Sequence, residues 1–385
     1  TALIHSLSVC EKKEIFKNWT ILLALFSFSL SLLGMFLVRS GILISVHSFA
    51  NDPARGIFIL IFLTLVIGGA LTIYFINSVK IKDKDNYKII SQDTLLLINN
   101  ILLVTATFTI LLGTMYPLIL DVIGLEKISV GTPYFNHVFI PIMIPLVILM
   151  GFIPLTKYSG KNILQINLVR LLISAVIIFI VSMILFNKFS LNNFNSFIGI
   201  FMFFWIIFNI IFISIKNIFI LNNPIKLLSN MGMYFAHIGL AIFILGATIV
   251  ENNKIEKELV MKIGDKVTVG DYIFKFNDIK EFKGKNYDAL IGNFVVTKNN
   301  VFITNLSSEK RIYLSSENPM TEAGIFPGLS RDLYVSLGTM VNTDKWSIRI
   351  YYKPLIRLIW LGALIMMLGG FLSIFIKRKI NYRYE

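Results

Sequence analysis

The sequence predicts a polytopic α-helical membrane protein that carries one small β-rich extramembrane domain. Hydrophobic residues make up 56% of the 385 residues, and the mean hydropathy is +0.75, far above that of soluble domains. Apolar runs long enough to cross a bilayer core of about 30 Å recur along the chain. Residues 251–354 lack such runs and instead alternate apolar and polar residues, as half-buried strands do.

The apolar runs predict about eight complete spans and an N-terminal partial span. Residues 1–10 form the partial span, and because Thr1 already lies inside an apolar segment, we expect further membrane segments upstream. The complete spans are expected near 19–38, 57–76, 95–116, 138–155, 168–186, 197–215, 231–250 and 355–376.

Basic residues predict the orientation of these spans. The formal charge is +14, but most of the excess lies in alternate loops, where it sets topology, and so it implies no nucleic-acid partner. We expect those loops to face the cytoplasm or matrix. They contain Lys12 to Lys17, Lys80 to Lys88, Lys157 and Lys161, Lys216 and Lys226, and Lys377 to Arg383.

Three regions follow from this pattern. Residues 1–250 form a helical bundle with an outer-face loop at 39–56, and residues 355–385 form the last span with a basic cytoplasmic tail. Between them, residues 251–354 form the β-rich domain on the periplasmic or intermembrane-space face. Alternation at 266–269 and 272–276 indicates several short strands, which favours a small barrel over a sandwich.

Composition also limits the chemistry. The single cysteine, Cys10, excludes an intramolecular disulfide and a cysteine pair for metal or redox chemistry. No Asp, Glu or Lys lies within the core of a span, which argues against an ion-coupled transporter. The heavy use of Ile, Asn, Lys and Phe resembles the coding bias of an AT-rich genome, so these residues receive little weight.

Histidine is the remaining candidate for function inside the membrane. His5 precedes Lys12 by seven residues and His237 follows Lys226 by eleven, which places each about 10–16 Å into the membrane from the same side. Two imidazoles at similar depth on different helices suit the two axial positions of one haem. Small residues near His237, among them Ala236, Gly239, Ala241 and Gly246, leave room for a flat macrocycle. The alternative is that both histidines make hydrogen bonds between helices and that the small residues serve packing.

The outer loop at 39–56 contains a third histidine, His47. The loop is more apolar than a solvated connector, which favours a short amphipathic helix at the interface. Arg39 and Arg55 flank it, and a guanidinium pairs well with carboxylates such as haem propionates. The alternatives are a phosphate anchor for Arg39 and an ordinary surface position for His47. The fourth histidine, His137, starts a span at an interfacial position and receives no role.

The loop residues also carry a family resemblance. The segments Leu37-Val-Arg-Ser-Gly, Ser45-Val-His-Ser-Phe and Asp52-Pro-Ala-Arg-Gly closely resemble the CcmF family, the haem lyase membrane subunits of cytochrome c maturation, and their NrfE-like relatives. The resemblance extends over essentially the whole chain. It continues through Thr1-Ala-Leu-Ile-His, Ala236-His-Ile-Gly, Met320-Thr-Glu-Ala, Arg331-Asp-Leu-Tyr and Tyr351-Tyr-Lys-Pro.

The resemblance implies two haem positions. In the family, a transmembrane pair matching His5 and His237 ligates a b-type haem, and an external pair holds the incoming substrate haem. His47 matches the second external histidine, while the first one and the family's Trp-rich segment are expected upstream of Thr1. Arg39 and Arg55 are our own candidates for contacts with the propionates.

The implied activity is haem lyase, or holocytochrome c synthetase, acting within a complex. Haem arrives on the chaperone CcmE, and the Cys-x-x-Cys-His thiols of apocytochrome c add to its vinyl groups, with CcmH/CcmI-type subunits supplying thiol chemistry and apocytochrome. The membrane is the bacterial inner membrane or the mitochondrial inner membrane. The β-rich domain is expected to dock partners or to shield the site. Two other functions stay open, namely a transporter or exporter of haem or another small molecule, and a scaffold in which every histidine is structural.

Overall fold

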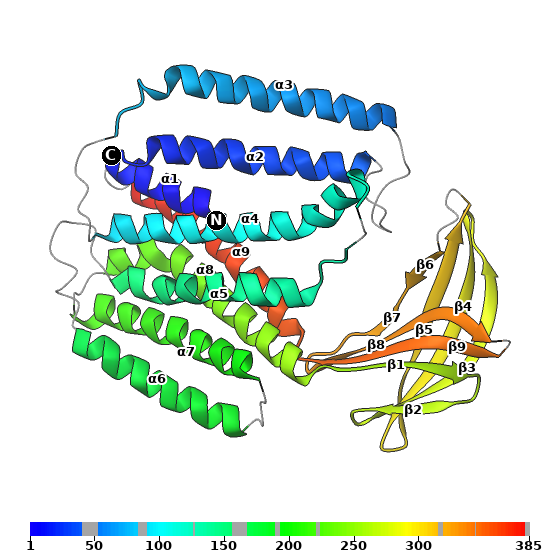
Figure 1. Cartoon of the computed structure of the whole chain (residues 1–385). Helices are drawn as coiled ribbons and strands as arrows, with labels where there is room; N and C mark the ends of the chain where they lie inside the picture. The colour runs from blue at the N-terminus through cyan, green and yellow to red at the C-terminus, as the bar shows by residue number, and fades with distance from the viewer. Residues whose placement is uncertain are drawn as a thin grey trace. The chain divides into compact units, whose positions relative to one another are not determined.

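The computed structural model describes the chain as two compact units, Thr1–Leu172 and Ile173–Glu385. Figure 1 shows the helices and strands of both units. The described residues are those of 1–385 other than 41–52, 84–90, 126–127, 156–167, 189–192, 221–223, 315–318, 343 and 382–385.

The first unit consists of helices. Large apolar side chains cover their outer surfaces: Phe58 and Leu65 are each 70% exposed, which is favourable only where lipid is the solvent. α4 begins at an N-cap, Ser91, whose hydroxyl accepts a 3.3 Å hydrogen bond from the Thr94 amide. The helices are α1 (Ala2–Lys13), α2 (Lys17–Arg39), α3 (Pro53–Ser78), α4 (Gln92–Val122), α5 (Thr132–Phe152) and a 3-10 turn, η1 (Ile153–Leu155).

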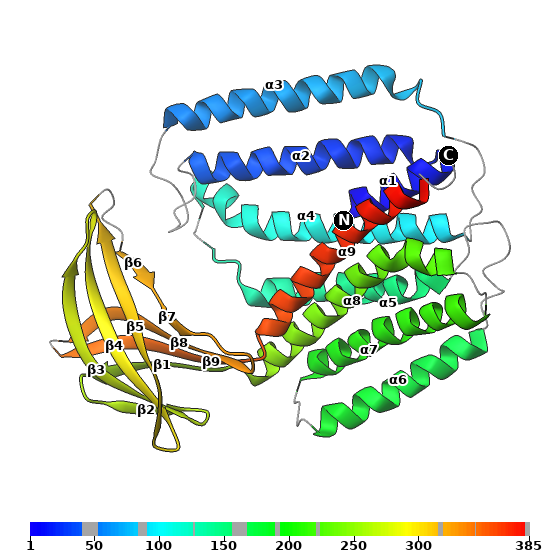
Figure 2. The same ribbon diagram turned by 180° about the vertical axis from the view of Figure 1, so that it is seen from behind.

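The second unit contains four long helices and a β domain. α8 leads directly into the first strand, and the last strand leads into α9, so the β domain is an insertion between these two helices (Figure 2). The helical elements are α6 (Leu168–Lys188), α7 (Phe194–Ile215), the π-helical turn η3 (Lys216–Ile220), α8 (Pro224–Asn253) and α9 (Arg357–Asn381).

The prediction of eight spans is confirmed. Among the described residues, eight helices are long and apolar enough to cross a membrane, and they are α2 to α9. α1 has 12 residues and matches the predicted partial span. Which side of the membrane the β domain occupies stays a prediction.

α8 and α9 pack with their backbones in contact. A Cβ atom on Gly239 would lie 2.6 Å from the Gly362 carbonyl oxygen, and one on Gly362 would lie 2.6 Å from the Gly239 carbonyl oxygen. The same closeness recurs two turns away, where a Cβ on Gly369 would lie 2.6 Å from the Gly232 oxygen. Lipid provides no hydrophobic drive for helix association, so close van der Waals contact along small residues is what holds such a pair together.

The β domain has two antiparallel sheets. One has the strand order β1-β9-β8-β7 and the other β2-β3-β4-β5-β6. The strands are β1 (Ile255–Lys262), β2 (Lys266–Val269), β3 (Tyr272–Lys283), β4 (Tyr287–Lys298), β5 (Val301–Tyr313), β6 (Pro319–Glu322), β7 (Gly324–Phe326), β8 (Arg331–Asn342) and β9 (Lys345–Pro354).

The two sheets enclose one apolar core, so the predicted barrel is wrong and the domain is a sandwich. Phe276 and Phe294 from one sheet are fully buried and stack with ring centroids 4.7 Å apart, and Ile348 from the other sheet is in the same core. The buried Ser308 links the sheets, because its hydroxyl accepts from the Leu337 amide at 2.9 Å. Alternation along a strand shows which face is buried, but it does not show whether the sheet closes on itself or splits in two.

Paired variants in α9 test the α8–α9 contact. In Gly369→Ala the new methyl group would meet the Ala236 amide nitrogen at 2.5 Å, whereas nothing lies within 4 Å of the Cβ position at Gly370. We expect Gly369→Ala to destabilise the protein by about 1–3 kcal/mol and Gly370→Ala to be neutral. Denaturant titration of the detergent-purified variants measures both free energies of unfolding, and equal stabilities would contradict this close packing of α8 and α9.

Candidate functional site

α1 lies antiparallel along the first half of α4. At one end Lys13 forms an ion pair with Asp93, whose side chain is only 8% exposed. In the middle, the fully buried Val9 belongs to a cluster that packs against Leu96 and Leu97. These contacts set the register of α1, and hence the position of its histidine.

His5 meets Asn99 one turn further along this contact. The His5 Nδ1 lies 3.2 Å from the Asn99 side-chain nitrogen, and Asn99 is only 4% exposed. Because Nδ1 is engaged within the protein, a metal would bind at Nε2, and it can do so only where Nδ1 carries the ring proton. The next residue, Asn100, is 1% exposed, and neither polar atom of its side chain has a hydrogen-bond partner among the described residues.

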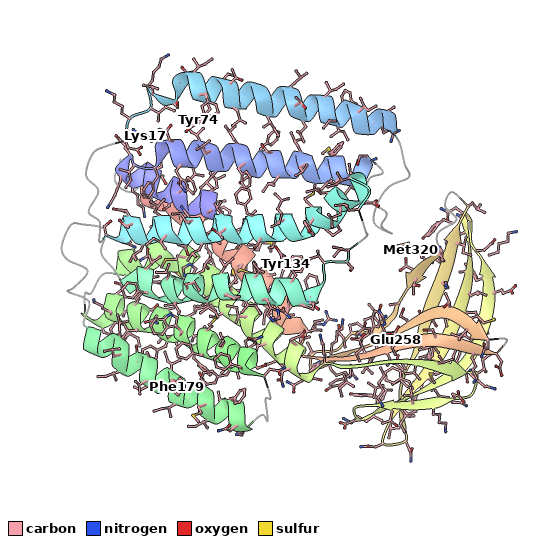
Figure 3. The ribbon with its side chains drawn as sticks, in the orientation of Figure 1. Lys17, Tyr74, Tyr134, Phe179, Glu258 and Met320 are labelled. Carbon is pink, nitrogen blue, oxygen red and sulfur yellow. The ribbon has the colours of Figure 1, made fainter. Side chains whose placement is uncertain are left out.

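A hydrogen bond between buried side chains links α1 to α2. The Ser6 and Thr20 hydroxyls share a 2.7 Å hydrogen bond, and both residues are buried. The Lys17 amide, at the start of α2, donates to the Asp83 carboxylate at 3.0 Å. Figure 3 labels Lys17 near Tyr74 of α3, so α2 begins at the end of this unit where α3 finishes. α1 is therefore held by contacts with α4 and with α2.

His237 lies on α8, half-buried and away from the glycine face. Gly239 and Gly246 both point at α9, since Cβ atoms there would lie within 3 Å of α9 backbone atoms. Thr248 contacts Gly199 of α7 on another face. The prediction that the glycines make room for a macrocycle is therefore wrong, and the packing alternative explains them.

His5 belongs to the first unit and His237 to the second. The pairing of these two imidazoles stays a prediction. The donor set itself fits a haem, since each residue is an imidazole on a membrane helix and His5 has one ring nitrogen held by the protein.

Arg39 and Arg55 lie at the same end of the α2–α3 hairpin. Arg39 is the last residue of α2, and Arg55 is in the first turn of α3. A Cβ on Gly56 would lie 3.1 Å from the Ser40 Cα, so the chain closes tightly at this point. His47, with most of the loop predicted as an amphipathic helix, lies outside the described residues.

His137 makes a local hydrogen bond. Its Nδ1 lies 2.7 Å from the carbonyl oxygen of Pro133, in the first turn of α5. This contact accounts for the side chain without a functional role.

Sequence reasoning missed the buried polar residues of the spans. We gave asparagine little weight because of the composition, yet Asn99, Asn100 and Asn209 are each less than 5% exposed. The spans therefore contain buried uncharged polar side chains, although no Asp, Glu or Lys lies within their cores. Two adjacent asparagines inside the apolar run Leu97-Ile-Asn-Asn-Ile-Leu were the available signal.

The described part of the chain has eight helices able to cross a membrane and a β-sandwich inserted before the last of them, which defines a polytopic membrane protein with an extramembrane domain. A family model described as the CcmF C-terminal beta-sandwich matches residues 252–354. The cytochrome c-type biogenesis protein CcmF of Escherichia coli K12 is 41% identical over 377 residues, covering 97% of this chain and 58% of that protein. The chain belongs to the CcmF family.

Other relatives are similar over nearly the whole of this chain. CcmF of Haemophilus influenzae is 40% identical over 404 residues, covering 100% of this chain and 60% of that protein, and NrfE of the same organism is 32% identical over 386 residues. A solved structure named cytochrome c heme lyase CcmF has the same fold, with a TM-score of 0.70 and 19% identity over 97% of this chain and 57% of that one. This chain therefore spans less than two thirds of the length of these relatives.

The Lys13–Asp93 pair gives a stability prediction. Lys13→Met leaves the buried Asp93 carboxylate without this cation, and we expect a loss of about 1–3 kcal/mol. The double variant Lys13→Met/Asp93→Leu should recover most of it, because no buried charge is left over. Thermal unfolding in detergent measures the cycle, with the exposed neighbour Lys12→Met as the control. Equal losses in the single and double variants would show that the pair does not fix α1.

Proposed function

We propose that this chain is the haem-handling membrane part of a cytochrome c haem lyase. The observation that carries the proposal is the 41% identity to a curated CcmF protein across 97% of this chain. Since the chain spans 58% of that protein, the activity, substrates and partners of the whole protein are part of the proposal.

The first step of the proposal is an inner haem held by His5 and His237. The similar predicted depth of the two residues supports it, and so does the Asn99 contact, which engages Nδ1 of His5 and so directs the iron to Nε2. Such a b-type haem, when bound, supplies one-electron transfer towards the outer face. Ferrous substrate haem is the form that reacts.

The second step is an outer site for the substrate haem. His47 ligates its iron, and Arg39 and Arg55 pair with its propionates. The support is the position of both arginines at the mouth of the α2–α3 hairpin, on either side of the segment that contains His47.

The reaction is the addition of two thiols to two vinyl groups. Each sulfur of the Cys-x-x-Cys-His motif bonds to the inner vinyl carbon, and the thiol proton ends on the outer carbon, so the addition consumes no oxidant. The catalytic role of His47 is to hold the substrate iron while both thioether bonds form.

The partners follow from the same proposal. CcmE delivers haem, CcmH/CcmI-type subunits deliver reduced apocytochrome c, and the β-sandwich of residues 251–354 docks them on the periplasmic face of a bacterial inner membrane. The bacterial sources of the curated relatives support this location over the mitochondrial one.

A transporter or exporter of haem is the second candidate. The buried Asn100, whose polar side chain has no hydrogen-bond partner among the described residues, is the observation in its favour. Uptake of haem into vesicles that contain the purified protein distinguishes transport from ligation.

Absorption spectra test the inner site. We expect the detergent-purified protein to show a low-spin b-type spectrum that is lost or becomes high-spin in His5→Ala and in His237→Ala, because each variant removes one axial ligand. His137→Ala is the matched control and should keep the parental spectrum. An unchanged spectrum in both ligand variants would exclude the assignment.

Cytochrome c assembly tests the outer site. We expect His47→Ala to keep the b-type spectrum but to lose most holocytochrome c, since the substrate site and the inner haem use different residues. Haem staining of c-type cytochromes in cells with His47→Ala as the sole copy measures this. Normal cytochrome c levels would remove His47 from the mechanism.

A further inference from the structure

We infer that Asn99 is a positioning residue that fixes the ring orientation and tautomer of His5, by accepting a hydrogen bond from the Nδ1–H group. The inference rests on the proposed function, in which Nε2 of His5 ligates haem iron. The observation that carries it is the buried contact between His5 and Asn99 at 3.2 Å.

Only one arrangement of this contact leaves a nitrogen for iron. A neutral imidazole has one N–H group and one lone pair. If the Asn99 amide NH₂ donated to Nδ1, the proton would be on Nε2 and the iron would have no ligand there. If Oδ1 accepts from Nδ1–H, the Nε2 lone pair is free to bind. In the structure the Asn99 side-chain nitrogen faces Nδ1. The two ends of a carboxamide have nearly the same shape, so a 180° turn of the Asn99 amide brings Oδ1 to this position instead.

The surroundings hold Asn99 in place. It is 4% exposed, so water does not compete for its amide. On one side of it, α1 is fixed against α4 by the Lys13–Asp93 ion pair and by the packing of Leu96 and Leu97 against the cluster that contains Val9. A buried hydrogen bond in a rigid register specifies one ring orientation.

A ligand held in this way changes the metal as well as the geometry. A hydrogen-bond acceptor on the distal ring nitrogen raises the basicity of the coordinating nitrogen. A more basic ligand stabilises ferric over ferrous iron and so lowers the reduction potential. Asn99 should therefore affect the potential of the haem even though it does not touch the iron.

Redox titration of the haem in the detergent-purified full protein tests the inference. Asn99→Leu removes the acceptor, and we expect a higher midpoint potential than in the parental protein. Asn99→Asp keeps an acceptor oxygen and should titrate at or below the parental value. Asn100→Leu is the matched control, because it changes the adjacent buried asparagine without touching this contact, and it should leave the potential unchanged.

The outcomes separate this inference from the proposed function. Lack of a b-type spectrum in the parental protein would overturn the proposed inner site, and this inference with it. A parental spectrum with Asn99→Leu at the parental potential, or with Asn99→Leu and Asn100→Leu shifted alike, would overturn the role of Asn99 alone. If Asn99→Leu does not fold, Asn99→Asp decides: a potential above the parental value overturns the inference, and one at or below it supports it.

Discussion

A bilayer interior offers no water to a polar group, and the rest of this structure depends on that constraint. It turns the apolar faces of the membrane helices outward and favours buried polar side chains that have partners inside the protein. The contacts of α1 show the consequence: Lys13 pairs with Asp93, Ser6 with Thr20, and His5 with Asn99. These contacts hold α1 at a defined register against α2 and α4.

The same constraint explains how the β-sandwich is attached. Without a hydrophobic drive between helices, α8 and α9 associate through backbone contact at their glycines. The pairing continues beyond the helices, since β1 follows α8, β9 precedes α9, and Ile255 lies opposite Tyr352 in an antiparallel ladder. Arg357, the first residue of α9, also lies 3.7 Å from Asp332 of β8. The pair of helices α8 and α9 therefore continues directly into the pair of strands β1 and β9.

The candidate haem ligands could be predicted from residue type, but the residues that hold them in place could not. Histidines are rare in this chain, so His5 and His237 stood out, and their depth followed from nearby lysines. Asn99 did not stand out, because asparagine is abundant in this sequence and the role of any one asparagine depends on which helix packs against it. The glycines of α8 were visible as well, yet their partner is α9, more than 100 residues away in the sequence.

Hydrophobicity and strand alternation are properties of a local stretch of sequence. They were therefore sufficient to predict the spans, the position of the β domain along the chain and the membrane class. Tertiary structure alone decided that the strands form two sheets rather than a barrel, that the glycines serve helix packing, and that Asn99 faces His5. Those outcomes depend on contacts between segments distant in the chain, and the periodicity of one segment does not specify its partner.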